Sequence, residues 1–166
     1  AVMRPQLVWL ATLALAMSGG CASLRFWERE PAPRPTTLRV YVAQRTPCDG
    51  CEQTRDDAGR ALYVHPDAIV TDVDVREASA LYSDQRSILL VRFNFVGGGR
   101  LQQATADHIG DELAVYIDDS LVFIAHINAP VNEGGLGLDP GWSRARVDAA
   151  VRWFNDPERQ HEHRDE

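Results

Sequence analysis

The sequence predicts an α+β domain, in which helices pack on one face of a small antiparallel or mixed sheet. Apolar and polar residues alternate in Leu38–Val42 and in Ile88–Phe95, as they do in half-buried strands. Leu113–Ile117 and Leu121–Ile127 are two further apolar runs, and the polar residues between them indicate an antiparallel hairpin. Strands interleaved with helical segments, together with one hairpin, are typical of this fold class.

Three segments are expected to be helical. Val75–Tyr82 has apolar residues at helical spacing after two aspartates that are suitable caps. Arg100–His108 is expected to be a short helix, preceded by a turn at Gly97–Gly99 that ends the strand before it. The last helix is expected to begin after Ser143 as its N-cap, with Trp142 packed on its first turn. Its predicted buried stripe comprises Val147, Ala150, Val151 and Phe154.

The charge of the chain disfavours one class of partner. The net charge is -7, and all 17 basic residues are arginines scattered among 24 acidic residues. Because nucleic-acid binding requires clustered basic residues that neutralise phosphates, we expect no nucleic-acid partner.

The N-terminal residues resemble an export signal. Arg4 is followed by the apolar run Leu7–Met17, which is shorter than the about 20 residues needed to cross a bilayer but has the proportions of a signal peptide. Small residues directly before Cys21 resemble the lipobox of bacterial lipoproteins, although Ser18 stands where that pattern usually has Leu. We therefore expect a lipoprotein-type signal peptide over residues 1–20 and lipidation of Cys21, with a plain cleaved signal as the alternative.

The remaining chain divides by composition. Residues 21–37 contain a charged, proline-rich stretch and are expected to form a spacer next to the membrane. Residues 38–155 are expected to form the folded domain, and residues 156–166 a disordered charged tail. A lipid anchor would hold the domain on the periplasmic side of the bacterial envelope, and Ala22 after the cysteine slightly favours the outer membrane.

Several stretches between residues 62 and 154 match the motifs of a known protein family, in the same order along the chain. They are Ile69–Ala78, Ile88–Phe93, Thr105–Gly110, Leu113–Asp119, Ile127–Val131, Gly134–Gly135 and Gly141–Ser143. In this order they resemble the head of the first periplasmic domain of SecD, a subunit of the SecDF protein-translocation accessory. The resemblance implies an α+β head fold and binding of polypeptide or an envelope protein partner, linked to protein export. It does not imply a translocation motor, because the sequence lacks the membrane helices of SecD.

We expect the partner-binding surface in the predicted hairpin and the glycine-rich loop after it, with apolar residues exposed at the turns. The residues concerned are Ile124, His126, Asn128, Pro130, Val131, Gly134, Gly135, Leu136 and Leu138. The segment Ile124–His126 stands where the family pattern has Ser-Ala-Pro. A purely structural envelope lipoprotein without a specific partner remains the alternative.

Cys48 and Cys51 form the sharpest local motif. In an oxidising periplasm, we expect them to form a structural disulfide. Asp49–Gly50 is a turn dipeptide without the surroundings of a thioredoxin-type redox pair, and for zinc His65 is the only nearby third ligand. We expect no catalytic residue, cofactor or bound metal, with thiol-disulfide exchange or metal binding at the cysteine pair as the alternative. His161–His163 is expected to be part of the polar tail.

Overall fold

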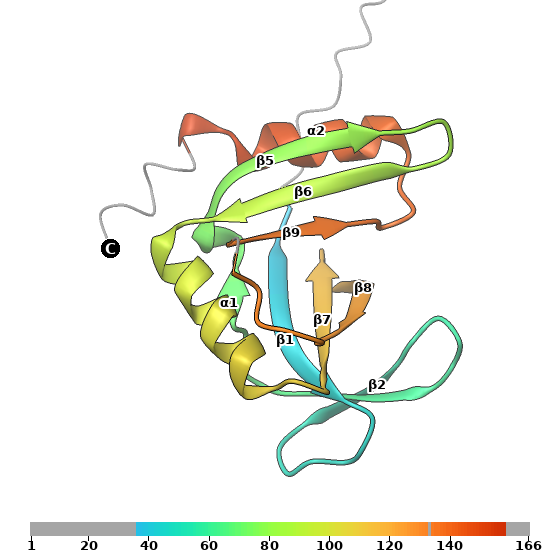
Figure 1. Ribbon diagram of the computed structural model, residues 1–166. Coiled ribbons are helices and arrows are strands. Elements are labelled where there is room, and N and C mark those ends of the chain that lie inside the picture. The colour runs from blue at the N-terminus through green and yellow to red at the C-terminus, as the bar shows by residue number, and fades with distance from the viewer. Residues whose placement is uncertain (1–35, 133, 159–166) are drawn as a thin grey trace, which may run out of the picture. The chain divides into compact units, whose positions relative to one another are not determined.

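The structure is a computed structural model that describes residues 36–132 and 134–158 (Figure 1). The predicted signal peptide, Cys21 and most of the predicted spacer and tail lie outside the described residues. In the described residues, no helix combines the length and the apolar character that a membrane span requires.

The described residues form two antiparallel sheets, two α-helices and one short 3-10 turn. The strands of the larger sheet are β1 (Leu38–Gln44), β2 (Glu52–Arg55), β3 (Ala61–Val64), β4 (Val70–Thr71), β7 (Glu112–Ile117) and β8 (Ser120–His126). The smaller sheet and the remaining elements are β5 (Val75–Tyr82), β6 (Ser87–Phe93), β9 (Gly135–Leu138), α1 (Phe95–Asp107), α2 (Arg144–Phe154) and the 3-10 turn η1 (Asp72–Asp74). The α+β class is confirmed, with the strands divided between two sheets.

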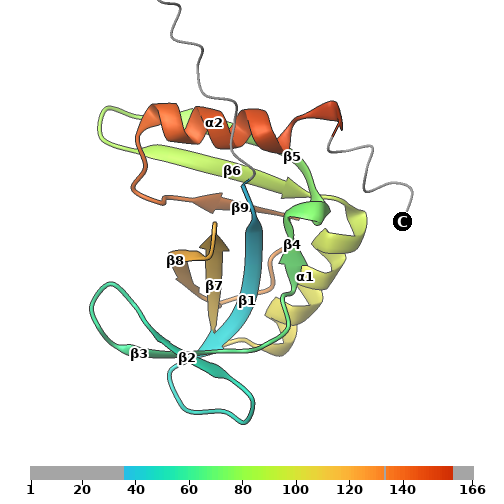
Figure 2. The ribbon, with the colours of Figure 1, turned by 180° about the vertical axis from the view of Figure 1, so that it is seen from behind.

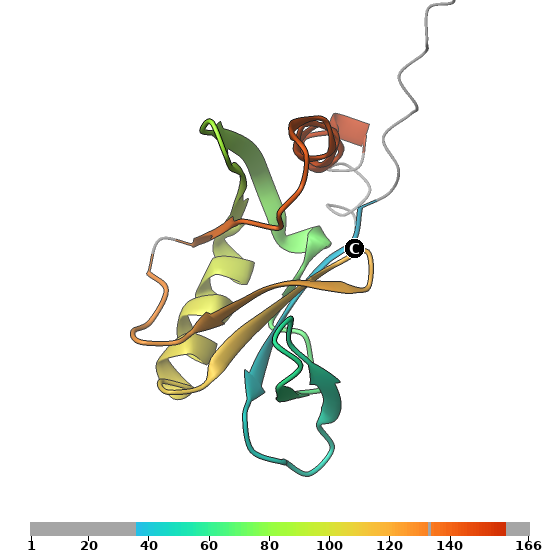
Figure 3. The ribbon, with the colours of Figure 1, turned by 90° about the vertical axis from the view of Figure 1, so that its right-hand side faces the viewer.

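The larger sheet has the strand order β2-β3-β1-β7-β8, with β4 also paired to β1, and the smaller sheet has the order β5-β6-β9. Helix α2 packs on β5 and β6, and α1 packs against β4 and β6. Figure 2 shows β4 beside β1, close to α1, and Figure 3 shows the β2–β3 hairpin at the end of the molecule opposite α2.

Two apolar clusters lie on opposite faces of the larger sheet. The main core joins this sheet to the smaller sheet and both helices, and its fully buried side chains include Leu38, Leu101, Leu138 and Phe154. The second cluster lies between the other face of the sheet and the β2–β3 hairpin. It consists of the buried residues Ala43, Leu62, Val64 and Ala114, with Tyr41, Tyr116, Leu121 and Ile124 packed against them.

The helix predicted over Val75–Tyr82 is wrong, because this segment is strand β5. Its inward side chains are Val75, Ala78, Ala80 and Tyr82, and a register shift lies between Val75 and Glu77. Such a bulge adds one residue to an alternating pattern and changes its spacing from two to three. The spacing therefore resembled that of a helix. Leu81, one of the apolar residues at this helical spacing, is exposed.

The turn predicted at Gly97–Gly99 is also wrong, because α1 begins at Phe95 and contains all three glycines. Asn94 caps this helix by accepting a hydrogen bond from the Gly97 backbone N–H at 2.8 Å. A Cβ atom on Gly97 would lie 2.6 Å from the Cβ of Asp74, so glycine permits a close approach of α1 to η1. Phe95, which the sequence places at the end of the predicted strand Ile88–Phe95, is almost fully exposed.

The predictions for the hairpin and the last helix are confirmed. β7 and β8 are joined by Asp118 and Asp119, which both have positive φ, as a two-residue turn of this kind requires. Ser143 caps α2 by accepting a hydrogen bond from the Arg146 backbone N–H. Val147, Ala150 and Phe154 of the predicted stripe are buried, and Val151 is half-buried against the core.

Candidate functional site

Strand β8 forms one edge of the larger sheet, where it pairs with β7 alone among the described strands. Its half-buried side chains pack against both apolar clusters. Val122 and Phe123 pack against the main core, whereas Leu121 and Ile124 pack against the second cluster. A register shift opposite Val115 inserts one extra residue into β8, which explains why two neighbours face the same core. The edge thus combines apolar side chains on both faces with an outer row of backbone groups.

A groove of about 430 Å³ lies beside β8. One wall is formed by Leu121, Phe123, Ile124 and His126 of β8, and the turn of the β2–β3 hairpin contributes Asp56 and Arg60. Apolar side chains therefore line the groove along the strand, and charged side chains line it at the hairpin turn.

The charged wall is organised by Asp56, whose carboxylate is buried. It accepts hydrogen bonds from the backbone N–H groups of Ala58 and Arg60 at 3.0 and 2.8 Å, and from the guanidinium groups of Arg60 and Arg45 at 2.8 and 2.9 Å. Burial alone would raise the pKa of Asp56, but the hydrogen bonds from Arg60 and Arg45 outweigh it and lower the pKa to about 2. The hairpin turn is consequently held closed by a carboxylate that stays ionised.

Glu112 connects this wall to β8. Its Oε1 atom accepts a hydrogen bond from Arg45 Nε at 2.9 Å, and its backbone lies opposite that of His126 in the β7–β8 ladder. Its Oε2 atom is buried and has no hydrogen-bond partner among the described residues. A buried acceptor without a partner costs about 1–3 kcal/mol, so a donor from a bound molecule would be stabilised there.

The structure separates the predicted partner-binding residues into two groups. Ile124 and His126 lie in the groove beside β8. The others belong to the following loop and β9, where Val131 and Leu136 pack partly against the main core and Leu138 is fully buried. Leu138 is therefore unavailable to a partner. The remaining positions are Asn128, Pro130 and Gly134 in the loop, and Gly135 at the start of β9.

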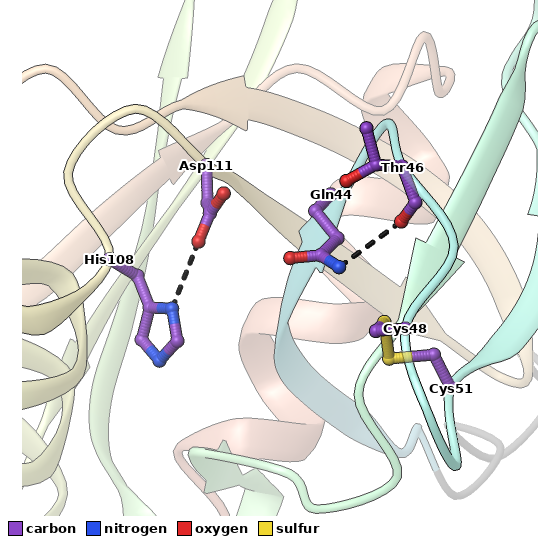
Figure 4. The surroundings of a disulfide bond; sticks show 6 residues. All are labelled: Gln44, Thr46, Cys48, Cys51, His108 and Asp111. Atoms are coloured by element: carbon purple, nitrogen blue, oxygen red, sulfur yellow. Dashed lines mark hydrogen bonds and ion pairs between the residues drawn. A yellow bond between two sulfur atoms is a disulfide. The ribbon is translucent and has the colours of Figure 1, made fainter.

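The predicted cysteine pair lies in the β1–β2 loop, away from this groove. The Cys48 and Cys51 sulfur atoms are at disulfide distance, and Figure 4 shows their surroundings. The two sulfur atoms and a ring nitrogen of His65 all lie within 4.8 Å of one another. The His65 ring also contacts the ring of His108, with centroids 5.6 Å apart. His108 was not predicted as a neighbour of this pair, because it lies at the end of α1.

A family model of the SecDF P1 head subdomain matches residues 49–139, more than half of the chain. The chain belongs to this family. The matched part of this SecDF P1 head runs from the β1–β2 loop to the end of β9. It therefore includes β8 and the turn of the β2–β3 hairpin, whereas β1 and α2 lie outside the match.

Solved SecDF structures share the fold. One, described as a membrane component that enhances protein export, has a TM-score of 0.57 at 13% identity, over 74% of this chain and 63% of that chain. A second, a SecDF in a super-membrane-facing form, has a TM-score of 0.53 at 15% identity, over 71% of this chain and 19% of that chain. This chain thus spans less than two thirds of either SecDF chain. A search of curated proteins finds no match.

Several groove residues were missed by the sequence analysis, namely Arg45, Asp56, Arg60 and Glu112. Only the turn sequence Asp56–Gly59 carried a signal, because aspartate and glycine are common in turns. The contact between Arg45 and Glu112 joins residues 67 positions apart, so it follows only from the pairing of β1 with β7.

Proposed function

We propose that this SecDF P1 head is a periplasmic, lipid-anchored and non-catalytic module that binds an extended polypeptide segment, in a role linked to protein export. The observation that carries the proposal is the outer edge of β8, which pairs with no strand among the described residues and lies beside the groove. A polypeptide that adds to this edge would form main-chain hydrogen bonds with β8, and its side chains would extend both apolar clusters. Membership in the SecDF P1 head family and the similarity to a SecDF that enhances protein export support the link to export.

Strand β8 is better suited to this role than the edges of the smaller sheet. β5 has charged residues at Arg76 and Glu77 and a bulge, and α2 packs against it. β9 has only four residues, and two of them are glycines without a side chain to pack. β8 has seven residues, no proline and no acidic or arginine side chain, which are properties of an edge that accepts another strand.

The polar side of the groove supports a polypeptide ligand in particular. Glu112 lines the groove, and its buried Oε2 atom would accept a hydrogen bond from a backbone N–H or an arginine side chain of the ligand after a local movement of the groove wall. The Arg45–Asp56–Arg60 cluster holds the hairpin turn as a fixed wall of the groove. Extended chains that offer both amide donors and alternating side chains would satisfy both sides of the groove.

Binding to a labelled peptide tests the proposal. The probe is a fluorescein-labelled ten-residue peptide of alternating valine and threonine with arginine at both ends, added to the full chain in detergent. The matched control is the same peptide with alternate amides N-methylated, which keeps the side chains but removes the donors for strand pairing. We expect saturable anisotropy changes with the first peptide, at least about tenfold weaker binding of the second, and slower hydrogen exchange in β8.

Equal binding of both peptides would show that strand pairing is not the mode of recognition. Absence of binding below about 1 mM would contradict the polypeptide role itself and favour a purely structural envelope protein. The anchor is tested separately by mass spectrometry of the protein isolated from the envelope. An acylated Cys21 at the N-terminus is expected, and an unmodified Cys21 would remove the lipid anchor from the proposal.

A further inference from the structure

The β1–β2 loop places three potential metal ligands together. The Sγ atoms of Cys48 and Cys51 and a ring nitrogen of His65 lie within 4.8 Å of one another. Zinc binds cysteine sulfur at about 2.3 Å and histidine nitrogen at about 2.0–2.1 Å in a tetrahedral arrangement. The three ligand atoms are therefore close enough to share one such ion once the two sulfur atoms are no longer bonded to each other and have moved apart.

The backbone, and not the disulfide alone, holds the two cysteines close. The Cys51 N–H donates a hydrogen bond to the Cys48 carbonyl at 3.3 Å, and Gly50 between them has a positive φ of 76°. The tight turn involves only the residues from Cys48 to Cys51, because the two cysteines are three positions apart in the sequence. Opening the sulfur–sulfur bond would therefore leave both thiols on the same turn, facing His65.

The backbone of His65 is held by a hydrogen bond, but the Nε2 atom of its side chain lacks one among the described residues. Its backbone N–H donates a hydrogen bond to the Val42 carbonyl at 3.0 Å, which fixes the residue beside β1. Its Nε2 atom is buried and has no hydrogen-bond partner in the described part of the chain. Buried imidazole nitrogens normally have a partner, because leaving one unpaired costs free energy. A metal ion bound at Nε2 would remove that cost.

His108 and Asp111 form a second layer next to His65. The His108 ring contacts the His65 ring edge to face. Its Nδ1 lies 2.9 Å from Asp111 Oδ2, an interaction that is drawn in Figure 4. Since a carboxylate only accepts hydrogen bonds, Nδ1 carries the proton. His108 is not among the three clustered ligands, so we assign it the role of positioning the His65 ring.

We infer that reduction of the Cys48–Cys51 disulfide converts this loop into a zinc site, with Cys48, Cys51 and His65 as ligands and a fourth position open to water. A dithiol reductant supplies two electrons and two protons, breaks the sulfur–sulfur bond and is itself oxidised to a disulfide. Zinc then displaces the two thiol protons as it binds the thiolates. The site joins the β1–β2 loop to the end of β3 and is independent of polypeptide binding at β8.

Metal titration of the oxidised and reduced protein tests this inference. The full chain carries Cys21→Ser, His161→Ala and His163→Ala, so that the third cysteine and the tail histidines do not bind metal. It is reduced with dithiothreitol and desalted under nitrogen, and Co²⁺ is added as a spectroscopic probe. We expect one equivalent of Co²⁺ with the absorption of a tetrahedral thiolate site, displacement by Zn²⁺, and release of two protons. The oxidised protein should bind at least about tenfold more weakly.

Matched variants identify the ligands. Cys51→Ser and His65→Ala should each weaken Co²⁺ binding at least about tenfold, whereas replacing the exposed His126 by alanine should leave it unchanged. His108→Ala should weaken binding less than His65→Ala, as expected for a positioning residue. Circular dichroism of each variant checks that the fold is retained. Equal binding by the oxidised and reduced proteins, or undiminished binding by folded His65→Ala, would overturn the inference.

Discussion

The two edges of the larger sheet are formed by two hairpins of opposite character. The β2–β3 hairpin ends the sheet with the four-residue strand Glu52–Arg55, whose side chains are polar and mostly exposed. The β7–β8 hairpin ends it with the seven-residue strand Ser120–His126, whose central side chains are apolar and half-buried. Short, charged edge strands discourage the addition of a further strand. One sheet therefore has a protected edge and an edge prepared for a ligand.

The hairpins also differ in what holds their turns. The β2–β3 turn is closed by buried Asp56, which gathers two arginine side chains and two backbone N–H groups, and by Gly59 with a positive φ. The β7–β8 turn consists of Asp118 and Asp119, both in the left-handed region. Here Arg39 forms an exposed ion pair with Asp119 at 3.1 Å. The turn next to the groove is thus fixed by a buried network, and the other turn by backbone geometry.

The largest expected effect is a loss of peptide affinity when a lysine is placed on the β8 edge but not when it is placed on the β2 edge. Ala125→Lys places a charge on β8 without leaving a cavity, and an added strand would have to bury or displace that charge. We expect the affinity for the valine-threonine peptide to fall at least about tenfold. The matched variant Gln53→Lys, on the β2 edge, should bind as the parent does. Fluorescence anisotropy measures both, and similar losses in the two variants would show that the edges are not functionally distinct.

Acid should act on the β2–β3 hairpin through Asp56. Its pKa in the folded protein is lowered to about 2, below the ordinary value of about 3.9. The ionised carboxylate therefore stabilises the fold above about pH 3.9, and this contribution is lost as the pH falls through about 2. An NMR titration that follows the Ala58 and Arg60 amides should show this midpoint, and Asp56→Asn should abolish it. A midpoint near 3.9 would mean that the arginine network does not hold the turn.

The backbone of the β2–β3 turn can be tested at Gly59. This residue has a φ of 75°, and a Cβ atom added there would meet nothing within 4 Å. Gly59→Ala should therefore cost about 1 kcal/mol in the free energy of unfolding, from backbone strain alone. Gly99→Ala is the control, because its site is equally open but lies within α1, where alanine should stabilise by about 0.5–1 kcal/mol. Urea unfolding compares them, and a destabilised Gly99→Ala would contradict this account.

The sequence predicted only one of the two hairpins. The β7–β8 hairpin was predicted, since two apolar runs flank a polar turn, and Ile124 and His126 were predicted for the binding surface. β2 was not predicted, because the residues Glu-Gln-Thr-Arg have no apolar alternation. The strand forms through pairing with β3, which is a tertiary effect.

Two further misses have local physical causes. The bulge in β5 changed the spacing of its inward residues, and the close approach of α1 to Asp74 explains the glycine at position 97, which was interpreted as part of a turn. The groove's polar wall could not be predicted, because Arg45 meets Asp56 and Glu112 only after β1 is placed between β3 and β7. Alternating and apolar runs indicated β1, β6, β7 and β8, but such runs do not indicate which side chains of separate strands meet.

The smallest expected effect concerns the turn of the β7–β8 hairpin. Asp119→Gly relieves a left-handed backbone that aspartate adopts with some strain, and it removes the exposed ion pair with Arg39. Relief of strain should exceed the loss of a solvent-exposed ion pair, so we expect a net stabilisation of about 0.5 kcal/mol. Asp119→Asn isolates the ion pair, since asparagine also tolerates this conformation, and should cost less than about 1 kcal/mol at low salt and almost nothing at high salt. Urea unfolding at two salt concentrations measures both variants. A destabilised Asp119→Gly at high salt would show that backbone geometry does not hold this turn, and the proposed difference between the two hairpins would be lost.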